Sequence, residues 1–240
     1  MENGSPFAFI VRCWYIIYTF IAKISSNSSL WQTKIGRFGE IANWVRYVQR
    51  NIDPNPKIFS NKDQLRQAAI DDIRLNGKEI IVLELGVAYG KGSMWLTKQL
   101  GSSLHLFFGF DRFTGLPRKW RGLNIGHFQT NGKPPASNDI RHNWYVGDAE
   151  ETVPRFLIER KELVAPNREY GLFILFDMDI LEPTMTAYRF LKPHLRSGDY
   201  IHFDEAFDSE NEMIVLNEFV NDFKSHLYGI TSEAITFKIL

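Results

Sequence analysis

Residues 84–93 read Glu-Leu-Gly-Val-Ala-Tyr-Gly-Lys-Gly-Ser, and the strongest structural signal of the chain lies here. An apolar run, 80–85, broken only by Glu84, leads into this segment and is typical of a buried parallel strand. The stretch 92–100 that follows has a helical pattern. Glycines at 86, 90 and 92 let the chain turn tightly and let a ligand approach the backbone. The helix N terminus behind them offers free N–H groups. The segment predicts a ligand-binding strand–turn–helix unit, with a tight turn that binds nothing as the alternative.

The same alternation continues on both sides of this turn. Strands are expected at 80–85, 104–110, 143–146, 172–176 and 200–203, and helices at 31–49, 63–75, 92–100 and 183–195. Strands that alternate with helices indicate a parallel sheet covered by helices on both faces. The stretch 118–143 is polar and rich in Gly, Pro and Asn, which predicts a long loop of the kind that often carries function.

Composition excludes some classes of protein. The chain is 44% hydrophobic and 23% charged, which is ordinary for a globular protein with a sizeable core. Lys plus Arg and Asp plus Glu both number 28, so no basic excess points to a nucleic-acid partner. The single cysteine, Cys13, cannot form an internal disulfide, and a reducing cytoplasm is the expected location.

The N-terminal stretch 7–24 is almost wholly apolar but is interrupted by Arg12, Thr19 and Lys23. Its uninterrupted part is shorter than the roughly 20 residues that span a bilayer. We expect a helix that packs on the domain or on a second copy of the chain, so a homo-oligomer is expected. A weak membrane-surface contact, a cleaved signal and a true membrane anchor are the alternatives. Residues 1–60 are thus predicted to be a helical extension and 61–240 the main α/β domain.

Acidic residues follow the second and third strands. Asp111 ends the second strand, where a carboxylate is placed to accept the ribose hydroxyls of an adenosine cofactor; a solvated turn residue is the alternative. The pattern E-x-G-x-x-x-G-x-G differs from the dinucleotide form G-x-G-x-x-G and matches class I methyltransferases, which use S-adenosylmethionine. After the third strand, Asp148 is the candidate to face the adenine amino group. Glu150 and a plain surface charge cluster are the alternatives.

Three further carboxylates follow the fourth and fifth strands. Asp177 ends the fourth strand, and Asp204 and Glu205 end the fifth. Adjacent parallel strands would bring them to one edge, where they repel one another unless a cation neutralises them. Such oxygen ligands suit Mg²⁺ or Ca²⁺, which would hold an acceptor hydroxyl while a neighbouring carboxylate takes its proton. Helix capping without a metal is the alternative.

Between residues 82 and 205 the sequence resembles the macrocin and mycinamicin type of sugar O-methyltransferase, a family that also includes aminocoumarin sugar methyltransferases. Residues 109–117 are similar to that family's G-F-D-S-F-E-G-L-P, 150–154 to E-D-T-L-P, 176–185 to L-D-G-D-L-Y-E-S-T-M, and 192–195 with 197–200 to Y-P-x-L-S-P-G-G-Y. The motifs occur in the family's order, which makes the combined signal strong.

The resemblance implies a Rossmann-like class I methyltransferase fold: a mostly parallel seven-stranded sheet with helices on both faces, preceded here by N-terminal helices. It implies S-adenosylmethionine as cofactor and Mg²⁺ bound by Asp177, Asp204 and Glu205, with Asp177 also the general base. The predicted cofactor-binding residues are Glu84, Gly86, Val87, Tyr89, Gly90, Ser93, Asp111, Arg112, Phe113, Asp148, Ala149 and Asp177.

The sequence therefore predicts a Mg²⁺-assisted O-methyltransferase for a hydroxyl of a sugar or glycosylated small molecule. A methyltransferase for catechol-like hydroxyls and a non-catalytic interaction module are the alternatives. The loop 118–143 and the N-terminal helices are expected to form a lid. Weaker candidates are the bases His127, His142 and His202, and the sugar-stacking rings of Trp120, Phe128 and Trp144, of which Trp144 is better suited to core packing.

Overall fold

The computed structural model describes residues 41–240 and divides the chain into two compact units, residues 1–50 and 51–240. Of the first unit, residues 41–50 are helical, in line with the predicted helix 31–49; the rest of that helix and the apolar stretch 7–24 lie outside the described residues. The second unit starts before the predicted boundary at 60 because Ile58 and Phe59 join the sheet edge. Ile58 forms a bridge with Ile230, and the Phe59 amide donates to the Ile230 carbonyl at 2.8 Å. In 41–240 no helix is both long and apolar enough to cross a membrane.

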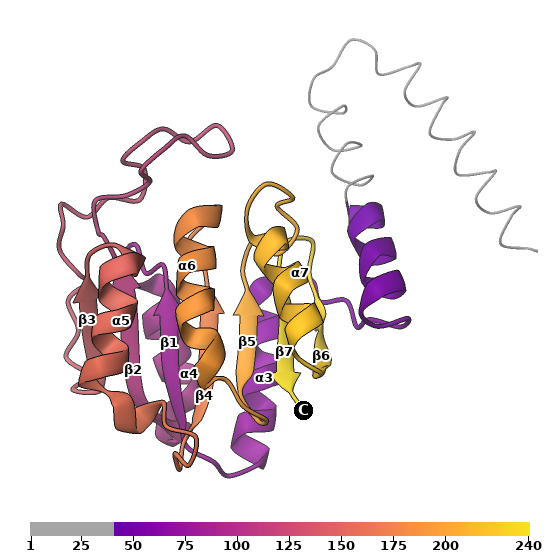
Figure 1. Cartoon of the computed structure of the whole chain (residues 1–240), viewed down its shortest axis with the longest axis horizontal. Helices are drawn as coiled ribbons and strands as arrows, with labels where there is room; N and C mark the ends of the chain where they lie inside the picture. The colour runs from indigo at the N-terminus through magenta and orange to yellow at the C-terminus, as the bar shows by residue number, and fades with distance from the viewer. Residues whose placement is uncertain (1–40) are drawn as a thin grey trace, which may run out of the picture. The chain divides into compact units, whose positions relative to one another are not determined.

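In the described part of the chain, seven strands form one sheet in the order β3-β2-β1-β4-β5-β7-β6 (Figure 1). The bounds are β1 Ile80–Leu85, β2 Leu104–Asp111, β3 His142–Val146, β4 Gly171–Phe176, β5 Tyr200–Phe203, β6 Ser225–Ile230 and β7 Ile235–Ile239. The first five strands are parallel, whereas β7 runs antiparallel to both β5 and β6. The carboxyl ends of β1, β2, β4 and β5 therefore meet at one edge.

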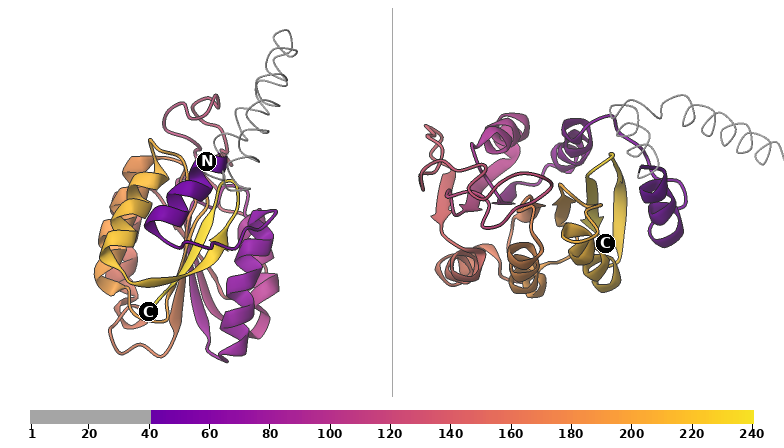
Figure 2. Two further views of the ribbon diagram at one scale, coloured as in Figure 1. Left: turned by 90° about the vertical axis from the view of Figure 1, so that its right-hand side faces the viewer. Right: turned by 90° about the horizontal axis from the view of Figure 1, so that it is seen from above.

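Helices cover both faces of this sheet, as the edge-on view in Figure 2 shows. Helices α3 (Lys62–Leu75) and α4 (Lys91–Leu100) lie on one face, and α5 (Ala149–Glu159), α6 (Leu181–Leu191) and α7 (Glu212–Asp222) on the other. Apolar residues of α3 and α4 pack with β1, β2 and β4 in one core cluster. On the opposite face the core is aromatic: the Phe108 and Phe156 rings lie 4.9 Å apart and those of Phe176 and Phe203 5.0 Å apart.

Helix α3 shows how local sequence sets an element. Asn61 caps it, because its side-chain oxygen accepts the amide of Gln64 at 2.9 Å. The buried side chains of Leu65, Ala69 and Ile73 recur every fourth residue, so one stripe of the helix faces the sheet. The helix ends at Asn76, followed by a glycine with positive φ, and Lys62, its first residue, is placed at the sheet edge that carries the strand ends.

Element boundaries differ from the sequence expectations in a few places. Helix α6 begins at Leu181, two residues before the predicted 183, because the Asn211 side chain accepts the Leu181 amide at 3.0 Å. It gives way to a 3-10 turn at Lys192–His194, where Pro193 supplies no amide hydrogen. The sequence patterns did not predict helices α5 and α7 or strands β6 and β7. The proline within α5 hides its helical pattern, and β6 contains a register shift near Gly229.

A buried ion pair ties β4 to the turn before β5. The Arg168 guanidinium donates to Asp199, and both side chains are essentially inaccessible to solvent. Asp199 also accepts the backbone amides of Leu172 and Arg196, each at 2.9 Å. Both carboxylate oxygens of Asp199 thus accept hydrogen bonds, which is the condition under which a buried charge is tolerated.

We expect Arg168→Ala to lower the free energy of unfolding by about 3–5 kcal/mol, because it leaves the Asp199 carboxylate buried without its counter-charge. Urea denaturation followed by circular dichroism measures this. Arg189→Ala is the matched control: its pair with Glu218 is solvent-exposed and should contribute no more than about 1 kcal/mol. Equal losses in the two variants would contradict the assignment.

Candidate functional site

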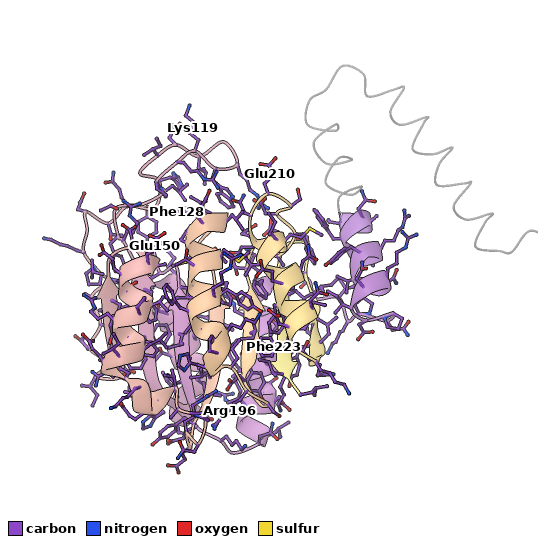
Figure 3. The ribbon with its side chains drawn as sticks, viewed as in Figure 1. Lys119, Phe128, Glu150, Arg196, Glu210 and Phe223 are labelled. Atoms are coloured by element: carbon purple, nitrogen blue, oxygen red, sulfur yellow. The ribbon has the colours of Figure 1, made fainter. Side chains whose placement is uncertain are left out.

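A cavity of about 740 Å³ opens at the carboxyl ends of the parallel strands. Its walls come from the turn after β1, the ends of β2 and β4, the segment after β5, the start of α5 and the long loop between β2 and β3. The lining residues are Gly86, Val87, Ala88, Phe110, Asp111, Arg112, Gly115, Leu116, Pro117, Arg118, Trp120, Phe128, Gly147, Asp148, Ala149, Glu150, Asp177, Met178, Asp179, Ile180, Glu182, Pro183, Asp204 and Glu205. Figure 3 labels two of them, Phe128 from the loop and Glu150 from α5.

The turn after β1 is shaped by a close approach of two backbones. Gly86 has φ +96°, and a Cβ built on it would lie 1.8 Å from the carbonyl oxygen of Asp177. The Gly86 amide donates to the Phe110 carbonyl at 2.9 Å, and the Asp177 amide donates to Leu85 at 2.8 Å. Only glycine fits this position, so the strand ends can lie side by side beneath the cavity.

Asp111 anchors the same turn. One of its carboxylate oxygens accepts the amides of Val87 and Ala88, both at 2.8 Å, and the other accepts the Phe113 amide at 2.6 Å. A carboxylate has about four acceptor positions, so Asp111 retains capacity for a ligand in the cavity it lines. It thus has a structural role that the sequence did not indicate, beside the predicted one toward a ribose.

The predicted adenine-facing residue, Asp148, lies next to Arg112. Asp148 is the residue before α5, and its Oδ1 lies 3.0 Å from Nε of Arg112. Both side chains line the cavity, as do Ala149 and Glu150. The pair therefore presents a carboxylate whose orientation is set by a neighbouring guanidinium.

Five of the predicted cofactor residues do not line the cavity. Glu84 and Ser93 are buried beneath the turn and hydrogen-bonded to each other, and Phe113 lies in the core. Burial raises the pKa of Glu84 to about 8, against the opposing hydrogen bond from Ser93 and the charge of Arg66. The remaining two belong to the outer part of the turn: Tyr89, which is exposed, and Gly90, which has no room for a Cβ beside Pro135.

Asp177, Asp204 and Glu205 share one sheet edge and line the same cavity, as the parallel-strand geometry predicts. Asp179 joins them, although the sequence analysis assigned it no role. Burial and the negative charge of Asp204 raise the pKa of Asp177 well above its usual range. Burial and the charges of Glu205 and Asp204 raise the pKa of Asp179 to about 7. A carboxylate whose pKa lies near neutral accepts a proton more readily than an ordinary one, so in its ionised form it can take the proton of a bound hydroxyl.

Two cations from distant parts of the sequence contact these carboxylates. The Lys62 ammonium lies 2.5 Å from Oδ2 of Asp204 and 2.9 Å from Oε1 of Glu205. Arg121, from the long loop, pairs with the other oxygen of Glu205 and reaches Asp208 at 3.2 Å. Burial alone would lower the pKa of Lys62, but the two carboxylates raise it above its usual value and keep the ammonium charged.

A divalent cation does not fit the carboxylates as they are arranged. Each carboxylate oxygen of Asp204 and Glu205 already has a protein partner, from Lys62, Arg121 or His202. Within 41–240 no group of three or more His, Cys, Asp or Glu side chains is arranged to hold a metal ion. The prediction of Mg²⁺ on Asp177, Asp204 and Glu205 gains no support from this arrangement, because the chain's own cations neutralise the crowded charges.

The histidines and Trp144, which the sequence offered as weaker candidates, have different surroundings in the structure. His202 is buried, with Nε2 3.2 Å from Asp204 and Nδ1 2.7 Å from the Thr236 hydroxyl. His142 contacts the Thr97 hydroxyl at 2.7 Å, and neither it nor His127 lines the cavity. Trp144 packs against the core residue Phe107, as expected.

The loop between β2 and β3 forms the outer wall of the cavity. Its Trp120 and Phe128 line the cavity, as the lid prediction implies. The Trp120 indole donates to Asp208 at 3.0 Å, and Arg118 pairs with Glu182 at 3.0 Å. Three cavity-lining residues other than glycine have left-handed backbones: Ala88, Phe128 and Asp179, with φ of 46°, 68° and 62°. Backbone strain of this kind gathers at functional sites.

Sequence reasoning missed Lys62, Arg121 and Asp179. Asp179 stands two residues after Asp177 and was visible as a second acidic residue in the same segment. Lys62 and Arg121 belong to no motif, and Lys62 reaches Asp204 over a separation of 142 residues. No local pattern reports such a contact.

Comparison with known proteins supports the fold. No protein-family model matches the sequence, and no match was found among curated proteins. One solved structure of CalS11, described as a calicheamicin methyltransferase, aligns with a TM-score of 0.57 and 20% identity over 99% of this chain and 94% of that chain. A second, the apo form described as a TDP-rhamnose 3'-O-methyltransferase, gives 0.52 and 20% identity over 99% and 96%. The O-methyltransferase NovP gives 0.54 and 15% identity over 74% and 78%.

These similarities, with the strand order and the antiparallel β7, show that the chain has the Rossmann-like class I methyltransferase fold. The fold predicted from the sequence is confirmed. The solved structures that resemble the chain include one described as a sugar O-methyltransferase, the kind of enzyme that the sequence motifs indicated.

We expect Gly86→Ala to destabilise the domain by at least about 3 kcal/mol, because the methyl group would overlap the Asp177 carbonyl oxygen in addition to straining φ. Gly122→Ala is the matched control, since Gly122 has φ +83° but nothing within 4 Å of the added Cβ. It should cost only about 1 kcal/mol. Thermal and urea unfolding of the two variants compare them directly, and similar losses would mean that the close approach contributes little.

Proposed function

We propose that the protein is an S-adenosylmethionine-dependent O-methyltransferase that acts on a hydroxyl of a sugar or a glycosylated small molecule. One observation carries the proposal: a single cavity is lined on one side by the glycine turn, Asp111 and Asp148, and on the other by partly buried carboxylates with raised pKa. A class I methyltransferase needs these two halves side by side.

The first half fits the cofactor. The Gly86 backbone offers close approach, and Asp111, held by three backbone amides, offers a fixed carboxylate for ribose hydroxyls. Asp148, oriented by Arg112, is the candidate for the adenine amino group. When bound, S-adenosylmethionine supplies an activated methyl group, which moves from its sulfonium to the acceptor oxygen as the hydroxyl loses its proton.

The second half handles that proton. We assign Asp177 as the general base because it lines the cavity, and because its raised pKa makes its ionised form a stronger proton acceptor than an ordinary aspartate. Asp179, next along the cavity wall, is the second carboxylate within reach of an acceptor. The proton of the acceptor hydroxyl thus moves to a side-chain oxygen of this chain.

The acceptor class follows from the outer wall. Trp120 and Phe128 line the cavity with aromatic surface, and Arg118, Glu182 and Asp179 add polar groups there. Rings combined with carboxylates and a guanidinium suit the apolar faces and hydroxyls of a sugar. CalS11 is described as acting on the rhamnose of a TDP-sugar, and this likeness in fold supports a sugar acceptor.

Cofactor binding is the first expectation to test. Calorimetric titration should show that the protein binds S-adenosylmethionine, and Asp111→Ala should weaken binding by at least about tenfold, because it removes both a ligand and the anchor of the turn. Asp71→Ala, on the exposed side of α3, should leave the affinity unchanged. A folded protein that does not bind would overturn the proposal and favour the non-catalytic interaction module.

Asp177→Asn tests the chemistry separately from binding. We expect methyl transfer to a sugar nucleotide to fall by about 10²–10⁴-fold, because the amide cannot accept the proton, while calorimetry finds cofactor affinity within a few-fold of the unaltered protein. Asp179→Asn is the companion variant. If only Asp179→Asn were inactive, the role of base would pass to Asp179. Transfer to catechols but not to sugars would refute the acceptor class.

A further inference from the structure

Lys62 is placed at the carboxylates by the fold itself. It is the first residue of α3, and the capping bond from Asn61 fixes where that helix starts. Its ammonium lies 2.5 Å from Asp204, 2.9 Å from Glu205 and 3.4 Å from Glu233. Because an ammonium has three N–H donors, it can serve these three carboxylates together.

The oxygens that a metal would need are those that Lys62 and its neighbours occupy. Asp204 is held by Lys62 on Oδ2 and by His202 on Oδ1, and Glu205 is held by Lys62 on Oε1 and by Arg121 on Oε2. The side chains of Asp204 and Glu205 are about 10% exposed, so little water screens these pairs. A divalent ion binding there would have to displace the ammonium from between the two carboxylates.

We propose that the Lys62 ammonium is the resident cation of this site, in the place where the sequence predicts Mg²⁺, and that it keeps divalent metal ions from binding there. Asp204 and Glu205 hold Lys62, which acts as a positioning residue for the carboxylate cluster. The inference goes beyond the proposed function and depends neither on the cofactor nor on the acceptor.

Direct metal binding tests this inference. Mn²⁺ is titrated into the purified full chain and free Mn²⁺ is followed by electron paramagnetic resonance, for the unaltered protein, Lys62→Met and the control Lys98→Met, which alters an exposed lysine of α4. We expect weak binding for the unaltered protein and for Lys98→Met. Lys62→Met should bind one equivalent at least about tenfold more tightly, because two carboxylates then lack their cation. Adding Asp204→Asn to Lys62→Met should abolish the gain, which assigns the new ion to this cluster.

Two results would overturn the inference: tight Mn²⁺ binding at this cluster by the unaltered protein, abolished by Asp204→Asn, or no gain of binding in Lys62→Met. Removing the ammonium exposes Asp204 and Glu205 to mutual repulsion, so Lys62→Met is expected to melt at a lower temperature. Millimolar Mg²⁺ should restore its melting temperature while leaving that of the unaltered protein unchanged; failure to restore it would contradict the proposal. Lys62→Gln, which retains polar contacts, provides a second variant for the same titration.

Methyl transfer gives an additional readout. If the protein proves active, activity should persist in excess EDTA, and a requirement for added Mg²⁺ would contradict the inference. Metal binding is measured without cofactor or acceptor. An absence of methyl transfer would therefore count against the proposed function alone, and the Mn²⁺ titration would still decide the role of Lys62.

Discussion

The contact between Gly86 and the main chain of Asp177 is the constraint on which the site depends. It brings the ends of β1 and β4 so close that no side chain fits between them. The glycine turn and the first buried carboxylate consequently share one cavity wall, and the amides of Val87 and Ala88 remain near Asp111. With these strand ends further apart, the two halves of the cavity would belong to separate surfaces.

Crowded negative charge is the second organising feature. Asp177, Asp179, Asp204 and Glu205 all face one cavity, and burial makes their ionisation costly. The fold deals with this cost of ionisation differently at the two sets of carboxylates. Asp204 and Glu205 receive cations and hydrogen bonds, so the pKa of Asp204 lies below its ordinary value despite burial. Burial still raises the pKa of Glu205, although Lys62 and Arg121 oppose the shift. Asp177 and Asp179 receive less compensation, and their pKa values rise as well.

The sequence predicted the positions of the five parallel strands because each strand carries its own local signal. The run 80–85 is apolar except for Glu84, and Asp111, Asp177 and Asp204 mark where strands end. Residues that act through local geometry, such as Gly86, could be found from motifs. Lys62 and Arg121 could not, because their partners lie far away along the chain and the contacts arise only when α3 and the long loop are placed. Glu84 and Ser93, assigned to the cofactor by motif position, are hydrogen-bonded to each other and buried beneath the turn.

The inner and outer walls of the cavity come from different kinds of structure. Its inner wall consists of strand ends whose backbone hydrogen bonds are fixed by the sheet, whereas Trp120 and Phe128 in its outer wall come from a single connection between β2 and β3. Each doubling of the length of a surface loop costs only about 0.6 kcal/mol of loop-closure free energy. The outer wall can therefore be remodelled by insertion or deletion while the sheet and the turn stay intact, provided that the contacts of Pro135 with Gly90 and of Arg121 with Glu205 are kept. A chain built this way can change the shape of its outer wall over evolutionary time without rebuilding the half of the cavity proposed to hold the cofactor.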